Sequence, residues 1–90
     1  MANILVCDDD KDIVEAIEIY LTQEGYHILK AYDGQEALDI IKSKHVDLVL
    51  TDIVMPFMDG LELSEILSRE FPDIHVVILT GHEDFEYAQK

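Results

Sequence analysis

The sequence contains one cysteine, two prolines, four glycines and only six basic residues. The single cysteine, Cys7, excludes an intrachain disulfide framework, so an apolar core must hold the fold together. With so little proline and glycine, the chain has no low-complexity or linker-like stretch. There is also no N-terminal signal segment and no apolar run long enough to span a bilayer. We therefore expect one small domain that works in a reducing compartment such as the cytoplasm.

The shortage of basic residues restricts the partners of the chain. Six Lys and Arg against twenty Asp and Glu give a formal net charge of −14. Such a surface repels phosphate backbones and anionic lipid headgroups. Direct binding to nucleic acid or to a membrane is therefore not expected.

Short apolar runs alternate with longer amphipathic segments along the chain. The predicted strands are Asn3–Cys7, His27–Ala31, Val46–Thr51 and His75–Leu79. The predicted helices run from Asp12 to Glu24, from Asp33 onward, from Asp59 to Phe71, and from Asp84 to Lys90. This alternation indicates an α/β fold with a parallel sheet.

Helix termini are marked by local chemistry. Two Asp-Gly-x-Glu segments, at Asp33 and at Asp59, predict N-caps with a reciprocal glutamate, and Gly25 is expected to end the first helix. Helical spacing predicts the buried faces, which are Ile13, Ala16, Ile17, Tyr20 and Leu21 in the first helix, Ala37, Leu38 and Ile41 in the second, and Leu63, Ile66 and Leu67 in the third.

Acidic residues follow two of the predicted strands. Asp8 and Asp9 come after the first strand and Asp52 after the third, while Thr80 follows the fourth. Carboxyl ends of parallel strands meet at one edge, where open sheets place their ligands. At roughly 4 Å, each pair of like charges there costs on the order of 4 kcal/mol. An isolated surface acid needs no explanation beyond solvation, and Thr80 could simply cap a helix, but three converging carboxylates require protonation or a bound cation.

At this point the chain resembles the response-regulator receiver domain, the phosphoacceptor module of two-component signalling. The resemblance rests on Ile4-Leu5-Val6-Cys7-Asp8-Asp9-Asp10, on Asp52-Ile53-Val54-Met55-Pro56 with Asp59-Gly60, and on Ile78-Leu79-Thr80-Gly81. It implies a flavodoxin-like (CheY-like) open parallel sheet with strand order 2-1-3-4. It also implies a single receiver domain over residues 1–90.

The same resemblance implies the roles of individual residues. Asp52 would be the phosphoacceptor, Asp9 and Asp52 direct ligands of Mg²⁺, Asp8 a ligand through water, and Val54 a carbonyl ligand. Thr80 would hydrogen-bond a phosphoryl oxygen. The chain would be a phosphoacceptor for a sensor histidine kinase rather than an enzyme with other substrates. It would control an output module outside these residues, such as the module of a transcription regulator.

One departure from the receiver pattern concerns the C-terminal part. Receivers continue through a fifth strand, which ends in a lysine that pairs with the phosphoryl group, and a fifth helix; the ninety residues end before both. We therefore expect an open edge at His75–Leu79 and an uncovered face on the first helix, and hence self-association through one of these surfaces.

Three other interpretations account for part of the same pattern. The first is a folding or assembly module that keeps the acids without being phosphorylated. The second is a phosphatase that forms an aspartyl phosphate, with Asp8 as the nucleophile, although such enzymes have longer chains. The third, a calcium-binding loop from Asp8, is excluded because Ile13 and Ile19 occupy the positions where that loop needs Gly and Glu.

Overall fold

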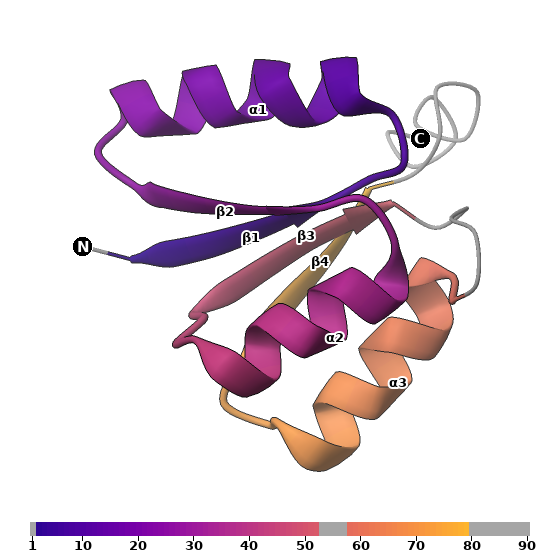
Figure 1. Cartoon of the computed structure of the whole chain (residues 1–90). Coiled ribbons are helices and arrows are strands. Elements are labelled where there is room, and N and C mark those ends of the chain that lie inside the picture. Colours follow the sequence, from indigo (N-terminus) through magenta and orange to yellow (C-terminus); the bar gives the residue numbers. More distant parts are fainter. Residues whose placement is uncertain (1, 53–57, 80–90) are drawn as a thin grey trace, which may run out of the picture.

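Four parallel strands form a single open sheet in this computed structural model, which describes residues 2–52 and 58–79 (Figure 1). The strands are β1 (Asn3–Cys7), β2 (His27–Ala31), β3 (Leu48–Asp52) and β4 (His75–Leu79), in the order β2-β1-β3-β4. This confirms the predicted strand order and the bounds of β1, β2 and β4. The helix predicted from Asp84 to Lys90 lies outside the described residues.

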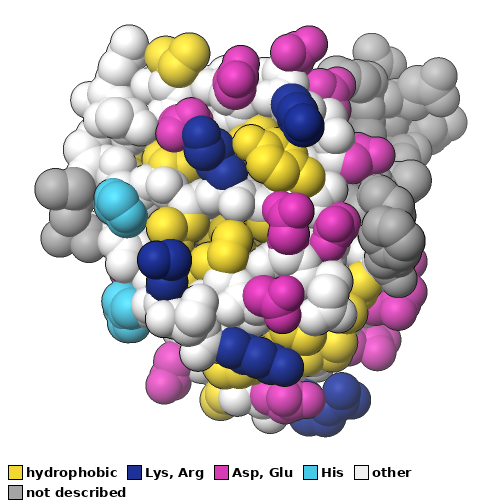
Figure 2. All heavy atoms as spheres, viewed as in Figure 1, with side chains coloured by type: hydrophobic (Ala, Val, Ile, Leu, Met, Phe, Trp, Pro, Cys, Tyr) yellow, Lys and Arg dark blue, Asp and Glu magenta, His cyan; other side chains and the backbone are white. Residues whose placement is uncertain are grey.

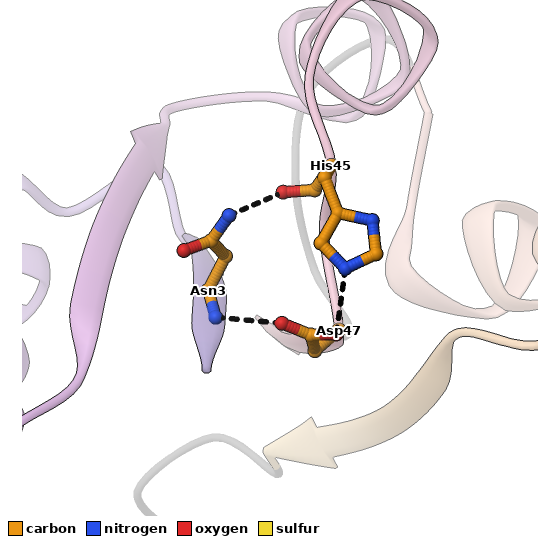
Figure 3. A network of polar contacts seen from close by, with 3 residues as sticks. All are labelled: Asn3, His45 and Asp47. Atoms are coloured by element: carbon orange, nitrogen blue, oxygen red, sulfur yellow. Dashed lines mark hydrogen bonds and ion pairs between the residues drawn. The ribbon is translucent and has the colours of Figure 1, made fainter. Parts of the chain in front are cut away.

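The third strand begins later than the apolar run Val46–Thr51 suggested, at Leu48. The backbone N–H of Asn3 donates to the Asp47 carboxylate (2.8 Å), and the Asn3 amide donates to the His45 carbonyl (2.8 Å), as Figure 3 shows. His45 also contacts the other Asp47 oxygen (2.9 Å). The Asp47 side chain, rather than a backbone carbonyl, accepts the hydrogen bond from the Asn3 N–H. The regular backbone pairing of β1 with β3 therefore starts one residue later, at Ile4 and Leu48.

Helices cover both faces of the sheet. Helix α1 (Lys11–Gln23) lies on one face, and α2 (Gly34–Ser43) and α3 (Gly60–Glu70) lie on the other (Figure 1). Buried side chains of β1 alternate between the two sides, with Leu5 and Cys7 in the cluster under α2 and α3 and Ile4 and Val6 in the cluster under α1. Burial on both faces explains why the strands read as almost continuous apolar runs.

Aspartates cap the three helices of the described residues. Asp33 and Asp59 accept hydrogen bonds from the backbone N–H groups of Glu36 and Glu62, both at 2.8 Å, so both predicted N-caps are confirmed. The reciprocal bond of Glu36 is present as well, although it goes to the N–H of Tyr32, one residue before the cap. The buried faces of α2 and α3 match the predicted ones at Ala37, Leu38, Ile41, Leu63 and Leu67.

The buried face of α1 matches the predicted one only in part: Ile17 and Leu21 are partly buried and pack against the core cluster under this helix. Val14 is fully buried, whereas Ala16 is exposed and Tyr20 is 65% exposed. The helix packs over β1 and β2. Its remaining side faces β3 and β4. There it borders an open apolar groove of about 370 Å³, lined by Ala16, Ile17, Tyr20, Leu21, Leu50 and Leu79. The helical period identified apolar positions but not which of them the sheet covers.

Candidate functional site

The carboxylates of Asp8, Asp9 and Asp52 meet at the carboxyl end of the sheet. Strands β1 and β3 are adjacent and parallel, with Cys7 in register with Thr51, so the residues that follow these two lie side by side. One carboxylate oxygen from each of the three acids lies within 4.8 Å of the other two. The structure thus brings together the acids that the sequence predicted to converge.

Asp8 is the buried member of this acid cluster, with 5% of its surface exposed. Its Oδ1 accepts a hydrogen bond from the N–H of Asp10 (2.9 Å), and its own N–H donates to the carbonyl of Ala31 in β2 (3.2 Å). Burial raises the pKa of the Asp8 carboxyl to about 6, and repulsion from Asp52 and Asp9 adds to this against the lowering effect of the Asp10 hydrogen bond. Without a counter-charge, ionising Asp8 therefore costs the folded protein more than it costs an exposed carboxyl.

Asp9 and Asp52 are more accessible than Asp8. Asp9 is exposed, and Asp52 is half-buried as the last residue of β3, in register with Leu79 of β4. An incoming group can therefore reach Asp52 from solvent while Asp8 stays at the base of the cluster. The three acids are ordered by depth, and the acid predicted to be the acceptor lies at intermediate depth.

Two fully buried residues lie directly below the acids. Cys7 precedes Asp8, Thr51 precedes Asp52, and the two are paired in register. Burial raises the pKa of the Cys7 thiol to about 12, with a contact to Thr51 acting in the opposite direction and nearby carboxylates adding to the rise. The thiol therefore stays protonated and adds no further negative charge to the site.

Sequence reasoning gave no role to Asp10, which the structure places next to the site. Its carboxylate accepts hydrogen bonds from the N–H groups of Asp12 (2.9 Å) and Ile13 (3.4 Å) and caps α1. Its own N–H orients the Asp8 carboxylate. An aspartate just before an amphipathic segment was the available signal for this cap.

The donor set of the acid cluster consists of oxygen atoms only, and this fits a hard cation. Mg²⁺ prefers carboxylate and carbonyl oxygens and keeps several waters when it binds proteins. Burial, and further the repulsion from Asp52 and Asp9, raises the pKa of Asp8, and a divalent cation beside these oxygens would favour the charged carboxylate. Val54 and Thr80, the other predicted site residues, lie outside the described residues.

Acidic side chains elsewhere do not gather in the same way. Figure 2 shows them spread over one face of the molecule, between Lys and Arg side chains and apolar patches. Asp39 and Asp73, for example, are exposed and far apart in the sequence. Within residues 2–52 and 58–79, Asp8, Asp9 and Asp52 form the sole group of three or more potential metal ligands.

Comparison with known proteins supports the same family as the fold and the acid cluster. Residues 4–90 match the sequence profile of the family described as "Response regulator receiver domain". The chain therefore belongs to the response regulator receiver domain family of two-component systems. The open sheet and its helices are the CheY-like flavodoxin fold of that family.

Individual relatives show how far the similarity extends. The chain is 40% identical over 78 residues to the response regulator GtcR of Aneurinibacillus migulanus, covering 87% of this chain and 32% of that protein. It superposes with a TM-score of 0.88 and 37% identity on the response regulator TrrA of Thermotoga maritima in complex with Mg²⁺–BeF, covering 97% of this chain and 76% of the other. In a complex of TrrA with the histidine kinase ThkA, the TM-score is 0.85 at 39% identity, with 91% of this chain and 71% of the other covered.

The chain matches only part of each curated relative. It spans between 18% and 37% of the lengths of five curated proteins that it matches. A helix long and apolar enough to cross a bilayer is absent from the part of the chain that the structure describes.

Proposed function

We propose that the carboxylate of Asp52 accepts a phosphoryl group from a phosphohistidine of a sensor histidine kinase. The convergence of Asp8, Asp9 and Asp52 within 4.8 Å is the observation that carries this proposal. A carboxylate oxygen of Asp52 attacks phosphorus in line, a new O–P bond forms, and the N–P bond to the imidazole breaks. The product is an acyl phosphate on Asp52, and the imidazole of the kinase leaves in its neutral form after taking a proton from solvent.

The acid cluster would hold the Mg²⁺ that this transfer requires. Asp9 and Asp52 would be its direct carboxylate ligands, Asp8 would act through a bound water, and Val54 would supply a backbone carbonyl. When bound, the ion supplies positive charge that shields the acids from the anionic phosphoryl group. Burial of Asp8 beside the more open Asp52 supports the assignment of Asp52, rather than Asp8, as the nucleophile.

Thr80 would report the phosphorylated state. Strand β4 ends at Leu79, which is in register with Asp52. Thr80 is the next residue in the sequence, and its hydroxyl group can donate a hydrogen bond. A donor of this kind gains a partner only when Asp52 carries a phosphoryl group. Residues 1–90 would then act as one receiver domain that passes this change to an output module outside the chain. The assignment to the cytoplasm, where such a kinase presents its phosphohistidine, is part of the same proposal.

Phosphorylation by a small acyl-phosphate donor tests the proposal directly. Intact mass after incubation with donor and Mg²⁺ should increase by one phosphoryl group in the wild type and in Asp73→Asn, which removes an exposed acid elsewhere. Asp52→Asn should show no increase, because a neutral amide replaces the anionic nucleophile. Peptide mapping that finds the label on Asp8 would favour a phosphatase-like chemistry, and no label at all would favour an assembly module.

The metal assignment has its own test. Titration with Mg²⁺ should show saturable binding to the wild type and affinity lower by on the order of tenfold or more in Asp9→Ala. Asp39→Ala, which removes an exposed acid on α2, is the matched control and should bind as the wild type does. Equal affinity in Asp9→Ala and the wild type would contradict the assignment.

Self-association is a second, separate proposal about partners. Among the described residues, β4 pairs only with β3, so its other side is a sheet edge, and Val77 on it is 43% exposed. The apolar groove between α1 and β3–β4 lies on the same side of the molecule. An open edge next to an apolar groove favours contact between two copies of the chain.

A further inference from the structure

The first residue of α2 lies unusually close to the chain that leads from Asp52 into α3. Gly34 is buried, and a Cβ at this position would lie 2.6 Å from both the Cβ and the carbonyl oxygen of Met58, and 3.0 Å from its Cγ. Real Cβ atoms do not approach other heavy atoms this closely. Since one of the atoms met is a backbone oxygen, a rotamer change of Met58 would not relieve the overlap.

Glycine is not required at position 34 for its backbone conformation. Gly34 begins a regular helix, and among the described glycines positive φ occurs at Gly25. At a helical position of this kind, alanine is the more favourable residue. The close approach to Met58 is therefore the physical reason for glycine here.

The turn formed by Asp33 and Gly34 also contacts the end of β1, which Asp8 and Asp9 follow. The Cys7 thiol donates to the carbonyl of Asp33 (3.4 Å), and Cys7 directly precedes Asp8. Two hydrogen bonds stabilise this turn: the N–H of Glu36 donates to the Asp33 carboxylate, and the N–H of Tyr32 donates to the Glu36 carboxylate. This turn therefore contacts Cys7, which directly precedes Asp8, and Met58, which lies between Asp52 and α3 in the sequence.

We propose that Gly34 is a positioning residue for the acid cluster. By leaving space for Met58, it fixes the point at which the chain coming from Asp52 enters α3, relative to the end of β1. Met58 packs against the core cluster below the site, and the next residue, Asp59, caps α3. Both contacts hold Met58 in position. This inference deepens the proposed function and rests on it, because the geometry that Gly34 fixes is that of the Mg²⁺ and phosphoryl site.

The test compares two variants with the wild type. Gly34→Ala forces Met58 away, while Met58→Gly keeps Gly34 and removes the packed side chain without adding any overlap. Both should lower the initial rate of labelling by a small acyl-phosphate donor by on the order of tenfold, because small displacements of reacting groups are costly. Both should also weaken Mg²⁺ binding in a titration of the protein with the metal alone. Gln35→Ala, on the exposed side of the same helical turn, should change neither quantity.

Denaturation curves recorded alongside separate positioning from stability. A purely structural role would lower the denaturation midpoint of the variants and leave the rate and the Mg²⁺ affinity of the folded protein unchanged, which would overturn the inference. If Gly34→Ala does not fold, Met58→Gly decides in the same way. If the wild type itself takes no label, the proposed function fails, and the Mg²⁺ affinities of the variants alone decide the positioning role: equal affinities overturn it and weaker ones support it.

Discussion

The carboxylate of Asp47 accepts a hydrogen bond from the backbone N–H of Asn3 at 2.8 Å and so joins the beginnings of two adjacent strands (Figure 3). This bond is the largest cause that lowers the pKa of Asp47, and the contact with His45 acts in the same direction. A lowered pKa means that the fold favours the charged carboxylate. Asp47 thus stabilises the amino-terminal edge of the sheet, opposite the acid cluster.

We expect Asp47→Ala to lower the urea midpoint at neutral pH, because the Asn3 N–H loses its acceptor. Asp47→Asn keeps an oxygen acceptor for this N–H and should lower the urea midpoint less than Asp47→Ala does. The contribution of a group with a lowered pKa is fully present above its ordinary pKa and disappears as the pH falls below it. The difference between wild type and Asp47→Ala should therefore be present at pH 7 and disappear as the pH falls below the ordinary pKa of a carboxyl; an undiminished difference at about pH 2 would contradict this account.

A second prediction concerns Gly25, which ends α1 with φ of 96°. Its N–H bonds to the carbonyl of Thr22, and the N–H of Tyr26 bonds to that of Leu21, which is the pairing of a Schellman motif. A Cβ here would meet no atom within 4 Å, so strain would come from the backbone alone. Gly25→Ala should lower the free energy of unfolding by about 1 kcal/mol. Gly25→Asn should lower the free energy of unfolding by less. Equal losses for the two variants would argue against backbone strain as the cause.

Local chemistry was enough to predict most of the fold. An apolar run defines a strand, and an aspartate before a helical pattern defines a cap, whatever the rest of the chain does. The convergence of Asp8, Asp9 and Asp52 followed from parallel topology, since residues after adjacent strands must meet. These features depend on residues that are close in sequence or on a rule that holds for every sheet of this kind.

Features that depend on contacts between distant residues were not predictable. The late start of β3 results from the bond between Asn3 and Asp47, which are far apart in the sequence. The exposure of Tyr20 depends on where α1 lies over the sheet, which helical spacing does not encode. The approach of Gly34 to Met58 likewise arises only once two helices are packed on one face.

A third prediction addresses self-association. At micromolar concentration, light scattering coupled to size exclusion should give a mass above that of one chain, because the open edge of β4 and the groove beside α1 pair with a second copy. Val77→Lys places a charge on that edge and should shift the wild-type distribution toward the monomer. Gln35→Ala, on the opposite face, should leave it unchanged. A wild type that elutes as a monomer and unfolds cooperatively would refute the proposal.

The last prediction follows from the cost of ionising Asp8. Its pKa, raised from 3.8 to about 6 chiefly by burial and further by Asp52 and Asp9, means that the fold disfavours the charged form. Unlike Asp47, such a group destabilises the folded protein above pH 6, and this cost is relieved as the pH falls from 6 toward 4. Asp8→Asn removes the charge and keeps an oxygen that can accept the Asp10 N–H bond.

In buffer with a chelator at about pH 7.5, Asp8→Asn should therefore be more stable than the wild type by about 1 to 3 kcal/mol. The advantage should vanish by about pH 4, where Asp8 is protonated in both the folded and the unfolded chain. If the folded acid cluster binds Mg²⁺ as proposed, addition of the ion at neutral pH should stabilise the wild type and narrow the difference in stability between the two proteins. Urea denaturation across this pH range, with and without Mg²⁺, measures all three effects. If Asp8→Asn were less stable than the wild type in chelator, the cost of ionising Asp8 could not be what a bound cation relieves.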